Sequence, residues 1–433
     1  MGNKFVVIGF GNGDEGKGSI VDYLVQKYGA ESVLRFSGGS QAGHNVVTPD
    51  GLHHTFAQFG SGTLVPGVET RISRFMLVDP LNMLEENDVL QKKGITDAME
   101  RTTLDKRCLV ITPFQKLLNR TLEISRGNNR HGSCGKGVGQ AVKDGEMLGE
   151  RMLSIGDLLN PAVVREKLKL LQGLNIRQAI RIEDKCRHDS DIMFQLEQKK
   201  TDDYFELLLE AYCEFAHSGV RIADNVCSGD IYEGSQGVLL DPKYGFWPYI
   251  TRTRTTFENA DKLIEESGDG KRVVKIGVLR AYASRHGPGP LVTEDEALTE
   301  KLRDCHNIEN RWQGGFRVGW FDLVATQYAF DALQCFFNLA ITNMDRLLDF
   351  EKVKVCVAYR HKGKTIKRLK VPKCPTRGQQ AKLAKIMMES EPVYEEVKTE
   401  NFIPFIELAL DRMVSILSFG PTANDKEEIR PPY

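Results

Sequence analysis

The stretch from Gly9 to Ser19 combines residue types that could act on a phosphate group. It reads Gly-Phe-Gly-Asn-Gly-Asp-Glu-Gly-Lys-Gly-Ser. Its glycines let backbone N–H groups converge on an anion, and Lys17 stands where a phosphate-loop lysine would reach a terminal phosphate, although the glycine spacing is not that of the Walker A motif. A pure phosphate cradle gains nothing from Asp14 or Glu15, so we expect one of these carboxylates to hold a metal or move a proton. The alternative is an ordinary glycine-rich turn.

The segments on either side of this stretch predict a strand, a turn and a helix. An apolar run, Lys4–Ile8, precedes it and an amphipathic run, Ile20–Val25, follows it. A second apolar segment, Ser32–Phe36, leads into another polar, glycine-rich loop that contains His44. Because ligands collect at strand ends in open α/β sheets, we expect a functional role for His44 rather than the structural role that a lone histidine usually has.

Two further loops have compositions that suit a nucleotide. Residues 126–139 carry three basic residues among glycines and no acid, which suits a phosphate, although a mobile surface loop can have the same composition. The expected strand Phe337–Ile341 ends in Thr-Asn-Met-Asp, and Asp345 could accept hydrogen bonds from the N1–H and 2-amino groups of guanine. The alternative for Asp345 is the cap of a helix N-terminus.

The remaining segments predict an α/β architecture. Residues 81–93 and most of 155–219 have helical spacing, and residues 362–380 read as a hairpin or a surface excursion. Further strands are expected at Arg74–Val78, Arg107–Ile111, Val273–Leu279 and Lys354–Tyr359, with a strand-then-glycine pattern at Ile231–Asp241. We therefore predict one α/β unit over residues 1–433, with a large central, mostly parallel sheet flanked by helices. Within it we expect a mostly helical subdomain at 97–220, which includes the basic loop, and a small β and loop excursion at 346–400.

The bulk composition excludes several function classes. Hydrophobic residues make up 41% of the 433 residues and charged residues 27%, and the formal net charge is −1. That balance gives no electrostatic reason to bind nucleic acid or an anionic membrane. No window approaches the roughly 20 apolar residues of a membrane span, and we expect no signal segment because the first residues already read as a strand. Nine cysteines without a Cys-x-x-Cys pair indicate reduced thiols, so we expect a cytoplasmic protein.

Taken in order, five motifs resemble those of the adenylosuccinate synthetase family. They are Gly13–Gly18, Ala42–His44, Glu233–Gly237 with Pro248–Thr251, Gly319–Asp322 and Thr342–Asp345. Five motifs in the family's order are far more specific than any one of them. The resemblance implies a fold related to P-loop proteins and a GTP- and Mg²⁺-dependent C–N ligase. Such an enzyme joins L-aspartate to C6 of a purine nucleotide, IMP, through a 6-phosphoryl intermediate, and the resemblance also implies a homodimer.

The resemblance assigns a role to each matching residue. Asp14 would remove the N1 proton of the purine, His44 would stabilise charge on the β–γ bridge and donate a proton, and Asp14 with the carbonyl of Gly43 would hold Mg²⁺. The implied GTP site comprises Gly13, Glu15, Gly16, Lys17, Gly18, Ser19, Gly43, Asn343, Asp345, Ser418 and Gly420. The implied site for the substrate nucleotide comprises Asp14, Lys17, Gln41, His44, Ser133, Cys134, Arg151, Gln236 and Thr251.

Several positions depart from the family's pattern. Asn343 stands where the family usually has a lysine, and Cys134 replaces a hydroxyl of a Thr-Thr pair by a thiol, which is a weaker donor. The family's arginine-rich amino-acid loop is replaced here by Asn-Arg-Trp-Gln-Gly-Gly-Phe-Arg. From this loop we expect contacts to the amino acid from Asn310, Arg311, Gln313 and Arg317. An aspartate has two carboxylates, which need cations to offset their desolvation.

These departures leave alternatives open. One is a ligase of the same superfamily that acts on a deoxy or modified purine nucleotide or on a different amine. Residues 420–425 are similar to the tail of phage enzymes that act on deoxyguanylate, although those enzymes lack the two aspartates that this chain keeps as Asp14 and Asp345. The other is a GTP-binding sensor without ligase activity. Asp14 and His44 argue against a sensor, because a protein that only binds GTP needs neither proton-transfer group.

Overall fold

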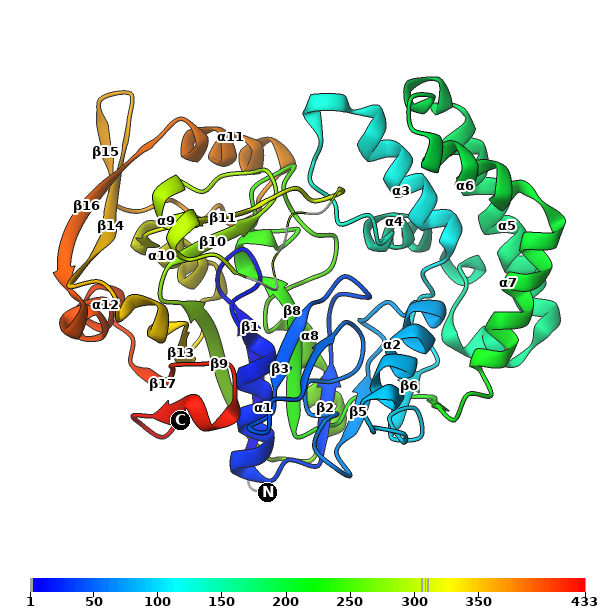
Figure 1. Ribbon diagram of the computed structural model, residues 1–433, viewed down its shortest axis with the longest axis horizontal. Coiled ribbons are helices and arrows are strands. Elements are labelled where there is room, and N and C mark those ends of the chain that lie inside the picture. Colours follow the sequence, from blue (N-terminus) through cyan, green and yellow to red (C-terminus); the bar gives the residue numbers. More distant parts are fainter. Residues whose placement is uncertain (1–2, 305–306, 308, 310, 433) are drawn as a thin grey trace.

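The main feature of the computed structural model, which describes residues 3–304, 307, 309 and 311–432, is a large sheet (Figure 1). Ten of the described strands form it. In spatial order they are β18 (Lys426–Glu428), β17 (Val414–Ser418), β13 (Asn338–Thr342), β9 (Arg272–Arg280), β1 (Asn3–Gly9), β8 (Ile231–Gly237), β2 (Ser32–Arg35), β5 (Glu69–Ile72), β6 (Thr102–Asp105) and β7 (Arg221–Ala223). Every neighbouring pair is parallel except β17 and β18. The predicted mostly parallel sheet is therefore confirmed.

The N-terminal strand β1 lies in the middle of this sheet and is buried on both faces. Its run Phe5–Ile8 is fully apolar because a central parallel strand has no face in water. Successive side chains alternate, so Phe5 and Val7 pack with α1 (Lys17–Tyr28), whereas Val6 and Ile8 pack with α8 (Glu258–Ser267) and α10 (Leu323–Leu333).

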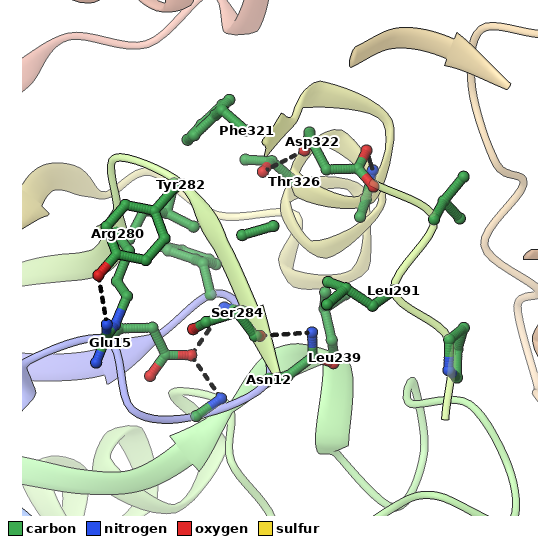
Figure 2. Close-up of a pocket in the computed structure, with 18 of the residues that line it drawn as sticks. Asn12, Glu15, Leu239, Arg280, Tyr282, Ser284, Leu291, Phe321, Asp322 and Thr326 are labelled. Atoms are coloured by element: carbon green, nitrogen blue, oxygen red, sulfur yellow. Dashed lines mark hydrogen bonds between the residues drawn. The ribbon is translucent and has the colours of Figure 1, made fainter. Parts of the chain in front are cut away.

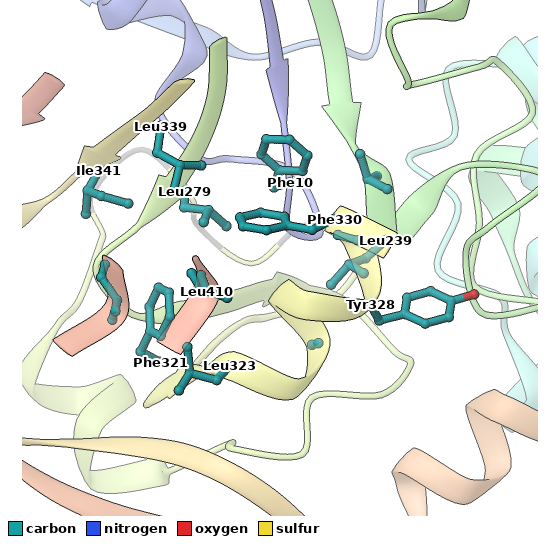
Figure 3. Packing of buried hydrophobic residues seen from close by; sticks show 14 of the residues in the cluster. Phe10, Leu239, Leu279, Phe321, Leu323, Tyr328, Phe330, Leu339, Ile341 and Leu410 are labelled. Carbon is teal, nitrogen blue, oxygen red and sulfur yellow. The ribbon is translucent and has the colours of Figure 1, made fainter. Parts of the chain in front are cut away.

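The residue after β1, Phe10, anchors the start of the glycine-rich loop in the core. Its ring packs among Phe330, Leu239 and Leu279 (Figure 3). A Cβ atom at Gly277 of β9 would lie 1.4 Å from the Phe10 ring, so only glycine fits there. The loop therefore leaves the sheet at a fixed point.

Two groups of elements flank the sheet on opposite sides of the view (Figure 1). The first is helical and comprises α3 (Pro113–Ser125), α4 (Val138–Leu148), α5 (Pro161–Ile180), α6 (Ser190–Lys200) and α7 (Asp202–Phe215). The second comprises β12 (Phe321–Asp322), β14 (Lys352–His361), β15 (Lys364–Ile366), α11 (Arg377–Met388), β16 (Glu391–Lys398) and α12 (Phe402–Leu410). The first group lies within the segment predicted as a subdomain at 97–220. The second includes the segment predicted at 346–400 but also β12 and α12, which lie outside those bounds, and the division into subdomains stays a prediction. None of the helices in the described residues is both long and apolar enough to cross a membrane.

Most expected elements form, but two strands were placed wrongly. The chain is extended in β5 (Glu69–Ile72) and β6 (Thr102–Asp105) rather than in the predicted Arg74–Val78 and Arg107–Ile111. Both real strands are mostly polar, with Ile72 and Leu104 as their single apolar residues, and they lie toward one edge of the sheet, so a search for continuous apolar runs passes over them. The apolar runs that follow them are irregular, contribute buried residues such as Met76 and Ile111, and are joined by an isolated bridge between Val78 and Val110.

Candidate active site

A cavity of about 400 Å³ lies where the central parallel strands end. The turns that follow β1, β2, β13 and β17 line it, together with the start of α1 and the hairpin of β3 (His44–Val47) and β4 (His53–Phe56). Because the carboxyl ends of parallel strands share one edge of a sheet, distant segments of the chain meet here. The predicted site residues that line it are Asp14, Gly16, Lys17, Gly18, Ser19, Gln41, Gly43, His44, Gln236, Gln313, Asn343, Asp345, Ser418 and Gly420.

Glu15 points into the protein and holds the glycine-rich loop together. Its Oε1 accepts hydrogen bonds from the backbone N–H groups of Gly11 (3.0 Å) and Gly13 (2.8 Å), and its Oε2 lies 2.6 Å from the Lys17 ammonium. A Cβ at Gly9 would lie 2.2 Å from this carboxylate, which explains the glycine there. The backbone N–H groups of Gly11 and Gly13 thus bind the protein's own Glu15 carboxylate. The donors left for a phosphate are those at the start of α1, whose N-terminus has no side-chain cap.

Asp14 faces the cavity instead, because its backbone adopts a left-handed conformation with φ of 60°. Its carboxylate has no hydrogen-bond or ion-pair partner within the described part of the chain. Burial raises the pKa of Asp14, and the nearby Arg280 charge opposes that effect. The Arg280 Nε donates a 2.5 Å hydrogen bond to the Asp14 carbonyl, and its guanidinium pairs with Asp304 at 2.9 Å. Arg280 therefore holds the backbone of Asp14 in place and opposes the rise in the pKa of its carboxyl group.

His44 is buried and paired with Glu233 of β8. The distance from His44 Nδ1 to Glu233 Oε1 is 2.6 Å, and Glu233 also accepts hydrogen bonds from the N–H and hydroxyl groups of Ser61. Burial would raise the pKa of Glu233, but the His44 and Arg35 charges lower it below its ordinary value. Burial lowers the pKa of His44, against the effect of Glu233. The ionised Glu233 therefore accepts a hydrogen bond from the Nδ1–H group of His44, which leaves Nε2 for a ligand.

The far end of the cavity has the groups expected around a purine base. Asn343, with φ of 60°, and Asp345 follow β13, and Ser418 and Gly420 follow β17. Asp345 has no side-chain partner among the residues described. The hydroxyl of Thr342 donates a 2.6 Å hydrogen bond to the Glu15 carbonyl, so this turn is tied to the glycine-rich loop.

Gln41 gives an independent sign of a ligand. It lines the cavity, and both its amide nitrogen and its amide oxygen are buried without a hydrogen-bond partner in the described structure. Because buried polar groups are nearly always hydrogen-bonded, this amide is suited to a polar ligand that completes its bonds.

Comparison with known proteins agrees with this geometry. The family model described as adenylosuccinate synthetase matches residues 6–426. The chain belongs to the adenylosuccinate synthetase family. It is 33% identical over 382 residues to the adenylosuccinate synthetase of Clostridium botulinum (strain Alaska E43 / Type E3), covering 84% of this chain and 83% of the relative. It is 31% identical over 463 residues to that of Hahella chejuensis, and both chains are covered completely. The predicted family and the predicted enzyme class, a ligase, are confirmed.

Two solved structures share the fold of this adenylosuccinate synthetase family member. The fully ligated adenylosuccinate synthetase of Plasmodium falciparum superposes with a TM-score of 0.78 at 20% identity and covers 99% of this chain and 100% of its own. The cyanophage S-2L succinoaminodeoxyadenylate synthetase, bound to dGMP and to dATP as an energy donor, has a TM-score of 0.60 at 15% identity and covers 100% of this chain and 96% of its own.

Several residues that the family resemblance implicates do not line the cavity. Ser133 donates to Asn119 Oδ1 at 2.8 Å, and its loop packs on Trp312, since a Cβ at Gly135 would lie 2.9 Å from that ring. The residues placed outside the cavity lining are Ser133, Cys134, Arg151, Thr251, Arg311 and Arg317, and Gly13 and Glu15 line a second cavity instead.

The loop from which we expect contacts to the amino acid has its arginines paired within the chain. Asn310 lies outside the described residues. Arg311 pairs with Asp189 and Asp191 of the helical side. Arg317 donates to the carbonyl of Gly287 and pairs with Glu294 at 2.5 Å. Both arginines are therefore engaged with other residues of the same chain, and the charged donors that line the cavity are instead Lys17, Arg280, Arg303 and Arg346.

A second, smaller cavity of about 50 Å³ lies behind the glycine-rich loop (Figure 2). It is mainly apolar, with Leu291 and Phe321 among its walls. Arg280 crosses its edge and donates to the Tyr282 hydroxyl at 2.8 Å, which holds the guanidinium in place. The Asn12 amide donates to the Ser284 carbonyl at 3.3 Å, so the rear of the loop is anchored too.

Sequence reasoning missed the roles of Arg280 and Glu233. Glu233 follows Ile231 and Tyr232 in a buried strand, and a buried charge in such a place needs a partner. Arg280 is the last residue of a strand that lies beside β1. A search for charged residues within buried strands or at their ends would have found both.

Proposed function

We propose that this chain is a GTP- and Mg²⁺-dependent ligase that joins L-aspartate to C6 of IMP through a 6-phosphoryl intermediate. The observation that carries the proposal is one cavity with an unpaired Asp14 carboxylate and the His44–Glu233 pair near the start of α1, and Asp345 at its other end. A proton-transfer group beside a phosphate site is the arrangement that this chemistry needs.

In the first step Asp14 accepts the N1 proton of the 6-oxopurine. The electron pair moves to the 6-oxygen, which attacks the γ-phosphorus of GTP and releases GDP. Arg280 supports this step because its charge favours the ionised form of Asp14 before proton transfer. His44 Nε2 faces the bridging oxygen in this proposal, and the charge of bound phosphates would raise its affinity for a proton.

In the second step the amino group attacks C6 and forms the C6–N bond, the C6–O bond breaks with its electron pair going to the departing phosphate, and the phosphate takes up the proton that the amine loses. Phosphate is a good leaving group where an amide oxygen is a poor one, so the first phosphoryl transfer makes the second step feasible. The Gln41 amide would orient the purine nucleotide, since both its donor and its acceptor are unpaired among the described residues.

The residues around Asp14 suit Mg²⁺. A carboxylate without a protein partner and the backbone carbonyl of Gly43 are oxygen donors, the class that Mg²⁺ prefers when it is shared with phosphates. When bound there, Mg²⁺ would neutralise phosphate charge. Lys17 contributes to the same end, because Glu15 uses one of its three donors and leaves the others for a phosphate.

The test is phosphate release from GTP with IMP and Mg²⁺, with and without L-aspartate, while the ultraviolet spectrum of the purine is recorded. We expect aspartate-dependent release and a spectral shift. Asp14→Asn should abolish turnover while GTP still binds, and Asp88→Asn, an exposed carboxylate on α2 (Pro80–Lys92), should not. Turnover retained by Asp14→Asn would refute its assignment as the base.

The internal pairing of Arg311 and Arg317 favours a second candidate, a ligase of the same type with a changed purine nucleotide or amine. GTP that binds but is not consumed with IMP and aspartate would direct the search to a matrix of purine nucleotides and amino acids. Absence of GTP consumption with every pair would instead favour a GTP-binding sensor. We also propose that the protein is a cytoplasmic homodimer. Sedimentation equilibrium should then give a molecular mass of twice that of the chain.

A further inference from the structure

The turn at residues 418–425 forms one wall of the base end of the cavity and is fixed from behind. Asp425 Oδ2 accepts hydrogen bonds from the Thr422 N–H and hydroxyl groups at 2.7 Å each. The Phe419 N–H donates to the Asp425 carbonyl at 2.9 Å. A Cβ at Gly420 would lie 2.7 Å from the Asp425 carboxyl carbon, so no side chain fits at Gly420.

Lys426, the first residue of β18, lies beneath this turn. Its side chain is 9% exposed, and its ammonium donates to the carbonyls of Gly420 at 2.7 Å and Thr422 at 2.8 Å. Burial lowers the pKa of Lys426, and the carboxylates of Asp425, Asp22 and Asp345 oppose that effect. Burying a cation costs free energy unless it is paired or hydrogen-bonded, so the Lys426 ammonium needs the carbonyl acceptors of this turn.

The acceptor capacity of the Gly420 carbonyl is fully used. A carbonyl oxygen has two lone pairs. One accepts from the Lys426 ammonium, and the other accepts from the Ser418 hydroxyl at 3.1 Å. This carbonyl therefore has no lone pair left for a ligand.

That saturation matters because the two common purine bases differ at position 6. Adenine presents an amino group that needs an acceptor, whereas guanine presents an oxygen that needs a donor. A free carbonyl on this turn would accept from the adenine amino group. With Gly420 saturated and Asp345 ready to accept from N1–H and the 2-amino group, this end of the cavity matches guanine and offers adenine nothing at position 6.

We propose that Lys426 is a positioning residue that sets the base preference of the energy donor, because it saturates the Gly420 carbonyl and so disfavours an adenine nucleotide. The inference rests on the proposed function, which takes GTP as the donor. The cyanophage S-2L protein of the same fold is bound to dATP as an energy donor, so the fold itself does not fix the base.

The test is equilibrium binding of GTP and of ATP to the purified protein, which needs no catalysis. Lys426→Met keeps the length of the side chain and removes its donors, whereas Lys426→Arg keeps a charged donor. We expect Lys426→Met to reduce the ratio of GTP to ATP affinity by about tenfold, or about 1.4 kcal/mol. Lys426→Arg should keep most of the wild-type ratio of GTP to ATP affinity. An unchanged ratio in folded Lys426→Met would overturn the inference.

A second variant covers the case in which Lys426→Met fails to fold. Ser418→Ala frees the other lone pair of Gly420 and leaves the buried cation in place, so ATP affinity should rise several-fold relative to GTP. A ratio equal to that of the wild type would overturn the inference. If the wild-type protein shows no preference for GTP over ATP, the GTP part of the proposed function is refuted as well. If the wild type prefers GTP and both variants keep that preference, only the role of Lys426 is refuted.

Discussion

Two adjacent carboxylates, Asp14 and Glu15, face opposite ways because the backbone at Asp14 is left-handed. Glu15 turns inward and binds the loop and Lys17, whereas Asp14 faces the cavity. Their types alone indicate that one of them does chemistry, but only the backbone conformation separates the two. The same holds for His44, whose ring orientation depends on Glu233, 189 residues away in the chain.

The His44–Glu233 pair leads to a prediction about catalysis. Glu233→Gln keeps the shape but removes the charge that fixes the Nδ1 proton, so kcat should fall about 10²-fold, within the range typical for a proton-transfer group. The KM for GTP should change little, because Glu233 does not itself line the cavity and acts only through His44. Steady-state kinetics on the ligase reaction measure both. A variant with normal kcat would mean that Glu233 only supports the fold.

Asp322 leads to a prediction about pH. It is buried at the start of α10, where it accepts hydrogen bonds from the Ala325 N–H (3.0 Å) and the Tyr359 hydroxyl (2.6 Å), and burial raises its pKa to about 6. Because the folded state holds this proton more tightly than the unfolded chain, its contribution to stability is complete below about pH 4 and is lost as the pH rises through about 6. The loss is up to about 3 kcal/mol.

Asp322→Asn has no such proton to lose. Urea unfolding at pH 5 and at pH 8 should therefore show a smaller drop in the free energy of unfolding for the variant than for the wild type. Parallel drops in both proteins would contradict the role given to Asp322.

At the scale of elements, the start of α1 and the β3 strand are packed backbone to backbone at Gly18. A Cβ there would lie 2.9 Å from His44 Cβ and 3.0 Å from the Asn45 carbonyl oxygen. The end of the helix that we propose binds phosphate and the proposed proton donor are therefore in direct contact. Any separation of α1 from β3 moves His44 relative to the phosphates.

Gly18→Ala tests this contact. Alanine is the better helix former, yet we expect the variant to bind GTP about tenfold more weakly and to lose stability, because the added methyl group pushes β3 away. Gly378→Ala in α11 is the matched control, since its Cβ would meet nothing closer than 3.9 Å and should stabilise the protein slightly. Isothermal titration with GTP compares them, and equal affinities would show that β3 adjusts without cost.

The elements also show what the sequence can predict. The strand, glycine loop and helix from Asn3 to Tyr28 are predictable because each step has its own local signal. The short strands β5 and β6 are not, because their stability comes from pairing with neighbours far away in sequence. The predicted site residues make up half of the cavity lining, and the ion pairs of Arg311 and Arg317 depend on tertiary contacts that no local pattern encodes.

At the scale of the whole molecule, the cavity joins segments that are distant in the chain. The glycine loop and the β3 strand come from the first 50 residues, whereas the turn at 343–345 and the turn at 418–425 come from the last 100. The ten-stranded sheet brings them together, because β1 and β13 both border β9 and β17 lies next along. A ligand that spans the cavity should therefore stabilise all of these segments at once.

Hydrogen exchange tests that expectation. GTP with Mg²⁺ should increase protection at residues 13–19, 343–346 and 418–425 together, because a ligand that binds only the folded state suppresses local opening around it. Helices α5 and α6, which contribute nothing to the cavity lining, should exchange as before. Protection confined to the glycine loop would mean that the base end does not take part in binding.

The late position of the turn at residues 418–425 in the chain has a consequence for protein synthesis. About 400 residues separate the start of α1 from residues 418–425. A ribosome that adds about 5–20 residues per second completes the helix on the order of 20–80 s before that turn. During this interval the nascent chain holds the proposed phosphate-binding segment but not the turn proposed to test the base. The base preference that we propose for Lys426 is therefore acquired only after this residue has left the ribosome.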